Sequence, residues 1–235
     1  MKLSILIPTY NEIKTLPTIL EKISKVKISN VNFEIIIVDD GSTDGTRDLL
    51  SRLSGKYKIF FHKKNSGKGA AIITAITNAT GDYILIQDAD LEYDPEDFHI
   101  LLAPVLKNNV PIVFGSRFLE GKFQVWSTKR IPRRTYLFGN KLLSLMTKIL
   151  FNKKISDMET GYKLIRMDII KSLNLKSRGF DIEPEITCKL LRKKVPIKEV
   201  PINYYPRGFE EGKKITWRDG IKAAYLLLKF RFKRI

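Results

Sequence analysis

In the first half of the chain, short apolar runs alternate with segments whose apolar residues recur at helical spacing. Residues 33–38 (FEIIIV) form one such run, and Leu16, Ile19 and Ile23 fall on one face of a helix over residues 12–26. Strands that are apolar on both sides are typical of a parallel sheet covered by helices on both faces. The pattern therefore predicts an α/β fold, with strands at residues 3–7, 33–38, 58–61, 83–86 and 111–114 and helices at residues 12–26, 43–53, 67–79 and 95–107.

The second half of the chain follows a different pattern. A polar loop comes after residue 118, and residues 135–151 and 216–234 both show helical spacing, with basic side chains set among the apolar ones. Between these two helices we expect a short strand, a helix at residues 184–193 and an extended segment at residues 195–204. The C-terminal helices are thus predicted to be amphipathic.

Length and composition fit a globular chain. Of its 235 residues, 43% are hydrophobic and 29% are charged, which argues against intrinsic disorder. The single cysteine, Cys188, excludes an internal disulfide framework and a cysteine-rich metal site. Because no repeat or long linker interrupts the chain, we expect one domain over residues 1–206, with halves at 1–118 and 119–206, followed by a basic amphipathic segment at 207–235.

The chain is strongly basic, with 42 Lys and Arg residues against 25 Asp and Glu residues and a net charge of +17. Most of this excess lies in two places. Residues 121–156 hold nine basic residues and no acidic one, and residues 207–235 hold nine basic and three acidic residues. Such a distribution favours an anionic partner, which would be a membrane surface, a phosphorylated acceptor or nucleic acid. The alternative is that the helices in these regions simply pack on the core or on a second subunit.

Polar clusters follow the predicted strands, and in open α/β sheets ligands bind at the carboxyl ends of the strands. Asp88 and Asp90 come directly after a buried strand, with the small Ala89 between them. Two carboxylates so close repel each other unless a cation lies nearby, and a divalent metal with oxygen ligands would answer that need. The alternative is a pair of solvated loop aspartates or a helix cap.

Two further clusters lie at the same predicted edge. Asp39 and Asp40 end another strand and could hold a nucleoside hydroxyl, although an Asp-Gly turn would also explain them. Gly67, Lys68 and Gly69 open a helix, where phosphate binds favourably. The spacing of these residues differs from that of a P-loop and from that of the GxGxxG motif of Rossmann dinucleotide sites. This disfavours a motor that hydrolyses nucleoside triphosphates and a dehydrogenase.

Short motifs occur in a defined order along the chain: PTYNE at 8–12, VDDGSTDGT at 38–46, GKG at 67–69 and DAD at 88–90, then GSRF at 115–118, DMETGYK at 157–163, GFDIEPE at 179–185 and EGKKITWRDG at 211–220. Together they resemble the GT-A domain of glycosyltransferase family 2, and the later ones resemble the dolichol- or polyprenyl-phosphate mannose and glucose synthases. The resemblance covers essentially the whole chain. It implies a Rossmann-like, mostly parallel sheet, with a nucleotide-sugar-binding half at 1–118 and an acceptor-binding half at 119–206.

The resemblance also implies a reaction and the residues that carry it. A hexose, mannose or glucose, would move with inversion from a nucleotide-diphospho-sugar such as GDP-mannose or UDP-glucose to a polyprenyl or dolichyl phosphate. The residues implied to bind the nucleotide-sugar are Pro8, Tyr10, Glu12, Asp39, Asp40, Lys68, Asp88, Arg207 and Lys213. Those implied to bind the acceptor are Arg117, Arg133 and Lys214, those implied to hold Mg2+ or Mn2+ are Asp90 and Glu92, and those implied to act in catalysis are Asp88, Asp90, Asp157 and Arg117.

The residues leave the acceptor open. A phosphate acceptor is already ionised at neutral pH, whereas a saccharide hydroxyl, as in polysaccharide or glycan assembly, would need a general base. Asp157 is the candidate base, and a turn cap is its alternative interpretation. Glu183 and Glu185 precede or open a helix, where acids interact favourably with the helix dipole, and catalysis is the less favoured interpretation of both.

Partners and location follow from the same features. No apolar segment has the length of a signal-peptide core or of a membrane-spanning helix. We therefore expect a cytoplasmic protein that associates peripherally with the cytoplasmic face of a membrane through its basic helices, alone, as a homodimer or with a membrane-anchoring subunit. Nucleic acid is disfavoured as a partner, because the aspartate clusters at the sheet edge would repel its phosphates.

Overall fold

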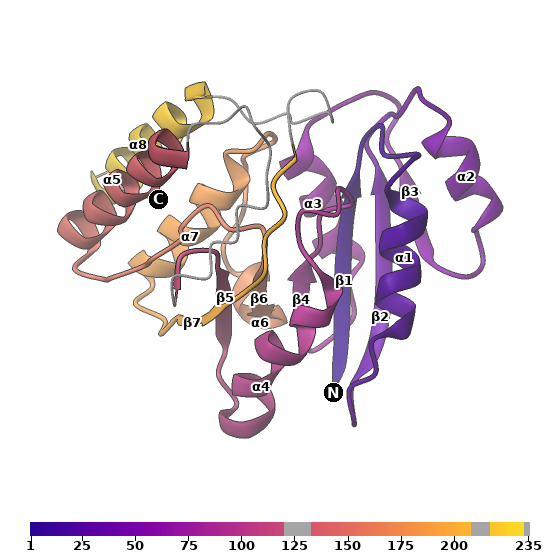
Figure 1. The fold of residues 1–235 in the computed structure, drawn as a ribbon, viewed down its shortest axis with the longest axis horizontal. Coiled ribbons are helices and arrows are strands. Elements are labelled where there is room, and N and C mark those ends of the chain that lie inside the picture. The colour runs from indigo at the N-terminus through magenta and orange to yellow at the C-terminus, as the bar shows by residue number, and fades with distance from the viewer. Residues whose placement is uncertain (120–132, 208–216, 233–235) are drawn as a thin grey trace.

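The described part of the chain forms one sheet that is covered by helices on both faces (Figure 1). The computed structural model describes residues 1–119, 133–207 and 217–232. The strands are β1 (Lys2–Thr9), β2 (Asn32–Asp39), β3 (Lys58–Phe61), β4 (Tyr83–Ile86), β5 (Ile112–Ser116), β6 (Lys163–Arg166) and β7 (Lys198–Pro201). The helices are α1 (Leu16–Lys25), α2 (Thr46–Arg52), α3 (Lys68–Asn78), the 3-10 helix η1 (Pro95–Asp97), α4 (Phe98–Asn108), α5 (Arg133–Phe151), α6 (Met167–Lys171), α7 (Ile182–Arg192) and α8 (Trp217–Phe232).

The sheet has the order β3-β2-β1-β4-β6-β5-β7. Parallel pairing joins β1 to β2 and β4, β2 to β3, and β5 to β7. Strand β6 is antiparallel to both of its neighbours, so β4 and β5 on its two sides run in the same direction. The predicted α/β architecture with a mostly parallel sheet is confirmed, and the carboxyl ends of all strands except β6 lie at one edge.

The strands are apolar throughout because each one packs against helices on both sides. In β4, Tyr83 and Leu85 belong to a buried cluster with α1 and α4, whereas Ile84 and Ile86 belong to a second cluster with α3, α6 and α7. Successive side chains of a strand point to opposite faces, so a strand covered on both sides needs apolar residues at every position. The sheet is thus held rigidly from two sides, and this fixes the loops at its carboxyl edge.

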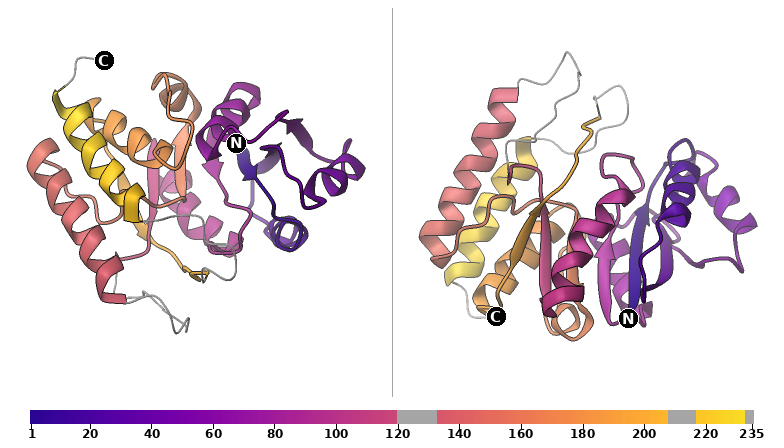
Figure 2. Two further views of the ribbon diagram at one scale, coloured as in Figure 1. Left: turned by 90° about the horizontal axis from the view of Figure 1, so that it is seen from above. Right: turned by 60° about the horizontal axis from the view of Figure 1, so that its bottom comes forward.

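Helices α5 and α8 form a further layer outside the sheet. They lie side by side against α7 (Figure 2), and their inner residues, which include Leu143 and Leu227, form a third buried cluster with Cys188 of α7. The two amphipathic helices predicted at 135–151 and 216–234 thus exist over nearly these ranges. Among the described residues, none of the helices combines the length and the apolar character needed to cross a membrane.

Two predicted helices begin later than the sequence pattern indicates, because the residues before them hold two loops together. Helix α1 begins at Leu16 instead of residue 12, and α2 begins at Thr46 instead of residue 43. The backbone N–H of Asn11 donates to Ser42 Oγ at 2.9 Å, and the backbone N–H of Thr43 donates to Asn11 Oδ1 at 2.8 Å. These bonds link the loop after β1 to the loop after β2, which places both at the same end of the sheet.

Candidate active site

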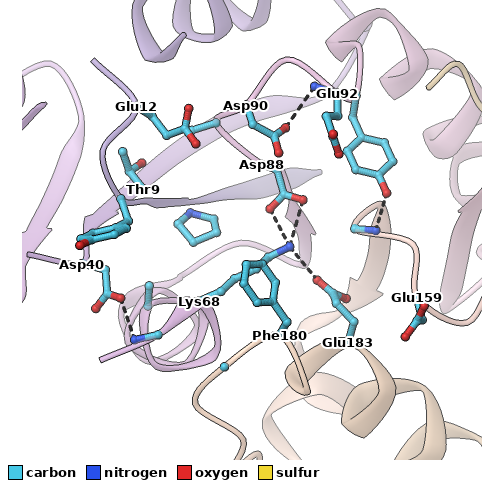
Figure 3. Close-up of a pocket in the computed structure, with 18 of the residues that line it drawn as sticks. Thr9, Glu12, Asp40, Lys68, Asp88, Asp90, Glu92, Glu159, Phe180 and Glu183 are labelled. Atoms are coloured by element: carbon cyan, nitrogen blue, oxygen red, sulfur yellow. Dashed lines mark hydrogen bonds and ion pairs between the residues drawn. The ribbon is translucent and has the colours of Figure 1, made fainter. Parts of the chain in front are cut away.

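A cavity of about 290 Å³ lies at the carboxyl edge of the sheet (Figure 3). One wall comes from the loops after β1, β2 and β4 and from the start of α3, and the other comes from the segments after β5 and β7 and the start of α7. The predicted site residues that line it are Pro8, Tyr10, Glu12, Asp40, Lys68, Asp88, Asp90, Glu92, Arg117 and Arg207. The fold therefore brings residues from both halves of the chain to one place.

Lys68 lies at the centre of a buried ion-pair chain. Its Nζ is 2.7 Å from Asp88 Oδ1 and 3.2 Å from Glu183 Oε1, so one cation joins the DAD motif to helix α7. On its other side Glu183 Oε2 lies 2.7 Å from the Nζ of the fully buried Lys163. Burial alone would lower the pKa of Lys68, but Asp88 and Glu183 raise it above its usual value, so Lys68 stays a cation in the cavity wall.

Asp90 lies beside Arg207 and the other carboxylates of the cavity. Arg207 Nη2 is 3.1 Å from Asp90 Oδ2, and Arg207 Nη1 is 3.2 Å from Glu12 Oε2. Burial, together with the charges of Asp88 and Glu92, raises the pKa of Asp90 to about 7, against the opposing effect of Arg207. Arg207 therefore does not offset the combined effect of burial and of the neighbouring carboxylates on Asp90.

Glu92 also lines the cavity, and its two carboxylate oxygens accept hydrogen bonds from the segment that follows β7. Tyr204 donates its hydroxyl at 2.8 Å, and the backbone N–H of Arg207 donates at 2.8 Å. Glu92 thereby holds the segment that carries Arg207 over the cavity. The predicted contact of Glu92 with a metal ion stays a prediction.

A divalent cation fits this donor set. Within the residues that the structure describes, no group of three or more His, Cys, Asp or Glu side chains is arranged to hold a metal ion. Magnesium and manganese sites that are completed by substrate phosphates do not need such a group, since one or two carboxylates suffice. Asp88 and Asp90 supply those oxygens at the cavity, and a cation would offset the burial and the neighbouring negative charges that raise the pKa of Asp90.

Asp40 lines the cavity and also shapes its wall. Its carboxylate accepts the backbone N–H groups of Ser66 at 2.9 Å and Gly67 at 2.7 Å, just before α3. His62 Nδ1 lies 2.7 Å from the same carboxylate. Asp39, by contrast, is fully buried outside the cavity lining, where it accepts the N–H of Ser42. Of the two aspartates predicted to contact the nucleoside, the structure thus brings only Asp40 to the cavity.

Arg117 and Asp157 form a buried bidentate pair. Arg117 Nε donates to Asp157 Oδ2 at 2.6 Å and Arg117 Nη2 donates to Oδ1 at 2.7 Å, while the Arg117 backbone N–H donates to Oδ2 at 3.1 Å. Arg117 lines the cavity, but Asp157 is fully buried behind it and is not part of the lining. Asp157 therefore orients the guanidinium of Arg117 toward the cavity, whereas its own carboxylate does not face the cavity.

Three predicted site residues have side chains outside the described part of the structure. Arg133 is the first residue of α5, and its side chain is outside the described part of the structure. Lys213 and Lys214 lie outside the described residues altogether. Their predicted contacts with the donor and the acceptor stay predictions.

Several cavity residues carried no predicted role. They are Thr9, Asn65, Tyr93, Glu159, Gly161, Phe180 and Tyr204, and Glu183, for which catalysis was the less favoured interpretation, lines the cavity with them. Glu159 and Gly161 belong to the DMETGYK motif, and Phe180 and Glu183 belong to GFDIEPE, so the motifs themselves were the available signal. Tyr93 fixes Gly161 by accepting its N–H at 3.0 Å, and a Cβ on Gly161 would lie only 2.7 Å from Asp88 Oδ2. The motif glycine lets the chain approach Asp88 closely.

The arrangement is suited to a charged phosphate ligand. Carboxylates that can hold a divalent cation line one cavity together with Lys68, Arg207 and Arg117, beyond the carboxyl ends of parallel strands. In doubly wound α/β proteins this is the place where nucleotides bind. Fold and site together define an α/β protein with a charged cavity at the edge where doubly wound folds bind nucleotides.

The chain belongs to glycosyl transferase family 2, whose family model matches residues 4–173. It is 32% identical, over 98% of its own length, to the dolichol-phosphate mannosyltransferase of Pyrococcus furiosus, and it covers 64% of that protein. It is also 32% identical, over 96% of its length, to a dolichyl-phosphate beta-glucosyltransferase of Trichomonas vaginalis, of which it covers 72%. The chain thus spans about two thirds of the length of these relatives.

The comparison with solved structures agrees with the fold. A glucosyl-3-phosphoglycerate synthase from Mycobacterium tuberculosis, in complex with Mn2+, uridine diphosphate and phosphoglyceric acid, superimposes with a TM-score of 0.73 at 19% identity, over 100% of this chain and 80% of that one. TarS from S. aureus, in complex with UDP-GlcNAc, gives a TM-score of 0.64 at 17% identity, over 98% of this chain and 66% of that one. The predicted GT-A fold is confirmed.

Proposed function

We propose that this protein is a metal-dependent, inverting glycosyltransferase that moves a hexose from a nucleotide-diphospho-sugar to a polyprenyl or dolichyl phosphate. The observation that carries the proposal is the convergence of the DAD carboxylates, Lys68, Arg207 and Arg117 on one cavity. The names of the two relatives, a dolichol-phosphate mannosyltransferase and a dolichyl-phosphate beta-glucosyltransferase, support the acceptor class.

On the donor side, the chemistry is the departure of a nucleoside diphosphate. Lys68 and Arg207 are cations in the cavity wall that can stabilise the negative charge developing on the leaving diphosphate. Asp88 and Asp90 would hold Mg2+ or Mn2+, which supplies further charge neutralisation at the diphosphate. The Mn2+ and uridine diphosphate in the neighbouring synthase structure support this use of metal. Asp40, on the wall that also carries Lys68, would contact the nucleoside.

On the acceptor side, Arg117 offers a guanidinium to an anion. An oxygen of the acceptor phosphate attacks the anomeric carbon of the sugar as the bond to the diphosphate breaks, and the configuration at that carbon inverts. A phosphate needs no general base for this step. The pairing of both Asp157 oxygens with Arg117 favours a phosphate over a hydroxyl, since Asp157 is the base that a hydroxyl acceptor would require. Arg133 and Lys214 are proposed as further acceptor contacts.

A lipid acceptor calls for contact with a membrane, and the outer side of α5 and α8 is suited to it. Large apolar side chains on these helices are strongly exposed, among them Leu145 at 52%, Ile149 at 71%, Tyr225 at 61% and Phe232 at 75%. Exposed lysines lie among them at positions 141, 148, 222 and 229. An exposed apolar surface of this kind with basic neighbours favours an anionic bilayer surface, and we propose peripheral association with the cytoplasmic face of a membrane.

The membrane contact is tested by flotation with vesicles that contain anionic lipid. We expect capture at low salt and release at high salt, because basic residues contribute an electrostatic attraction that salt screens. A variant with Ile149→Asn and Tyr225→Asn should float less, whereas Ile100→Asn, which changes an exposed apolar residue of α4, should float like the wild type. Absence of capture at low salt would refute the membrane contact and leave the transferase proposal intact.

The transferase activity is tested by a donor screen. The protein is incubated with GDP-mannose, UDP-glucose and other nucleotide-sugars in Mn2+ or Mg2+, with and without a short polyprenyl phosphate, and release of nucleoside diphosphate is measured. We expect release that depends on the lipid phosphate and is lost in Asp90→Ala. Slow release of nucleoside diphosphate at the same rate with and without the lipid phosphate would contradict the proposed acceptor and favour a saccharide hydroxyl.

A further inference from the structure

The segment that carries Asp157 is held from behind by a second carboxylate. Glu199 of β7 accepts the Ser156 backbone N–H at 2.9 Å and 3.0 Å on its two oxygens, the Ser156 hydroxyl at 2.7 Å and the Asp157 backbone N–H at 3.2 Å. Three donors from two consecutive residues thus converge on one side chain. This fixes the backbone from which the Asp157 carboxylate reaches Arg117.

Ser156 is held on its other sides by neighbouring elements. Asn140 and Ser144 of α5 donate to the Ser156 carbonyl oxygen at 2.8 Å and 3.2 Å, and Ser116 of β5 shares a hydrogen bond of 2.6 Å with the Ser156 hydroxyl. Ser116 directly precedes Arg117 in the chain. The backbone at Ser156 therefore connects β7, α5 and β5 at the point where Arg117 leaves the sheet.

We propose that Glu199 is a positioning residue for the acceptor phosphate, which it serves through Asp157 and Arg117. Glu199 fixes Asp157, and Asp157 presents Arg117 to the cavity in one orientation by its bidentate contact. The inference rests on the proposed function in one respect, namely that Arg117 contacts the acceptor phosphate. It assigns to Asp157 the role of an anchor for Arg117 instead of that of a general base.

The geometry explains why a carboxylate is needed at position 199. All three donors reach Oε1, and the Ser156 N–H is also 3.0 Å from Oε2. A glutamine of the same shape could keep the acceptor at Oε1, but its amide N–H would then face the Ser156 N–H. Glu199→Gln should therefore loosen the Ser156 and Asp157 backbone without removing volume. Because Arg117 is set by a charged bidentate contact, small displacements of Asp157 are transmitted to the guanidinium.

The test is steady-state kinetics of Glu199→Gln with the donor identified by the screen and with farnesyl phosphate as the acceptor. We expect the KM for farnesyl phosphate to rise about 10-fold, while kcat and the donor KM stay within about twofold of the wild type. Ser156→Ala, which removes one of the three donors to Glu199, should give a smaller rise in the same constant and serves if Glu199→Gln does not fold. Asp157→Asn should also raise the KM for farnesyl phosphate.

The matched control is Glu34→Gln. Glu34 is a buried carboxylate of β2 that accepts the Thr80 backbone N–H at 2.9 Å and the hydroxyls of Ser4 and Thr80, at the opposite edge of the same sheet. The substitution Glu34→Gln should lower the stability of the fold without changing the KM for farnesyl phosphate. An unchanged acceptor KM in Glu199→Gln, or equal changes in the donor and acceptor constants, would overturn the proposal.

Direct binding separates this inference from the transferase proposal. Farnesyl phosphate and a nucleoside diphosphate are each titrated into the wild type and Glu199→Gln by calorimetry, without any turnover. Weaker binding of farnesyl phosphate alone in the variant supports the positioning role, even if the wild type transfers no sugar and the proposed reaction fails. If the wild type binds no farnesyl phosphate, Arg117 does not bind the acceptor phosphate, and the positioning role of Glu199 is refuted.

Discussion

The guanidinium of Arg207 lies 3.1 Å from the carboxylate of Asp90, although 117 residues separate the two along the chain. The segment after β7 brings Arg207 there, and Glu92 holds that segment by accepting the Arg207 backbone N–H. Arg207 therefore sits against the carboxylate that is proposed to bind metal. A divalent cation at Asp90 would have to share that carboxylate with Arg207 or displace it.

This relationship predicts that Arg207→Gln binds Mn2+ more tightly than the wild type when no nucleotide is present. Removing the guanidinium makes the electrostatic potential at Asp90 more negative. At a pH where Asp90 is ionised we therefore expect the Kd for Mn2+ to fall about fivefold, as followed by the electron paramagnetic resonance of free Mn2+. With a nucleoside diphosphate added, the variant should lose affinity for the nucleotide, because Arg207 is proposed to neutralise the diphosphate.

A matched control for this experiment is Arg47→Gln. Arg47 lies 3.5 Å from Asp39, a carboxylate outside the cavity lining, so its removal should leave the Kd for Mn2+ unchanged. If Arg207→Gln binds Mn2+ less tightly than Arg47→Gln, Arg207 does not compete with metal at Asp90.

Lys68→Met is expected to destabilise the fold. Lys68 has only 14% of its side chain exposed and pairs with two carboxylates, so the variant leaves Asp88 and Glu183 facing each other without their shared cation. Removing one partner of a buried ion pair costs about 3 kcal/mol in the free energy of unfolding. Lys22→Met, which breaks the more exposed pair with Asp94, should cost less than about 1 kcal/mol in the same urea titration. Equal losses in the two variants would show that the Lys68 pairs are as well solvated as the surface pair.

The sheet edge was predictable because strand ends are marked in the sequence. Apolar runs that stop at Asp88 or at Asp40 predict where carboxylates gather, since parallel strands end at one edge. The contacts behind that edge were not predictable. Asp157 is a motif residue that is suited to base catalysis in the sequence, yet the structure pairs it with Arg117, 40 residues away in the chain. Only the packing of β5 against the loop before β6 decides that partner.

The contact of His62 with Asp40 could not be predicted from the sequence either. Nothing in the sequence around it suggested a role, because a single histidine after a short strand is typical of a surface residue. In the structure its Nδ1 lies 2.7 Å from Asp40 and its Nε2 lies 2.9 Å from Thr74 Oγ1 on α3. The contact joins β2, β3 and α3, and such tertiary hydrogen bonds leave no periodic signal in the sequence.

Gly161→Ala is expected to disturb the DAD motif. A Cβ at this position would lie 2.7 Å from Asp88 Oδ2 and 3.1 Å from the ring of Tyr93, so Asp88 has to move. We expect stability to fall by about 1–3 kcal/mol and the affinity for a nucleoside diphosphate with Mn2+ to fall at least 10-fold in calorimetry. Gly139→Ala is the control, because a Cβ at Gly139 in α5 meets nothing within 4 Å. That variant should gain about 0.5–1 kcal/mol from helix propensity and bind nucleotide normally. Normal nucleotide binding by Gly161→Ala would contradict the assigned role of Asp88.

Asp97 gives a prediction for the dependence of stability on pH. It accepts the backbone N–H and the side-chain amide of Asn203, each at 2.8 Å, and burial raises its pKa from 3.8 to about 6. Between these two pKa values the folded chain binds more protons at Asp97 than the unfolded chain does. The contribution of this residue to stability is therefore fully present below about pH 4 and falls as the pH rises toward about 6.

We expect the free energy of unfolding of the wild type, relative to Asp97→Asn, to fall by about 2 kcal/mol between pH 4 and pH 7. Urea titrations of both proteins at several pH values measure this difference. Asp168→Asn should show the opposite trend, because Arg166 lowers the pKa of Asp168 and the wild type then gains stability relative to the variant as Asp168 ionises. If the advantage of the wild type over Asp97→Asn instead grew with pH, the two bonds from Asn203 would outweigh burial and the ionised form of Asp97 would be the favoured one in the fold.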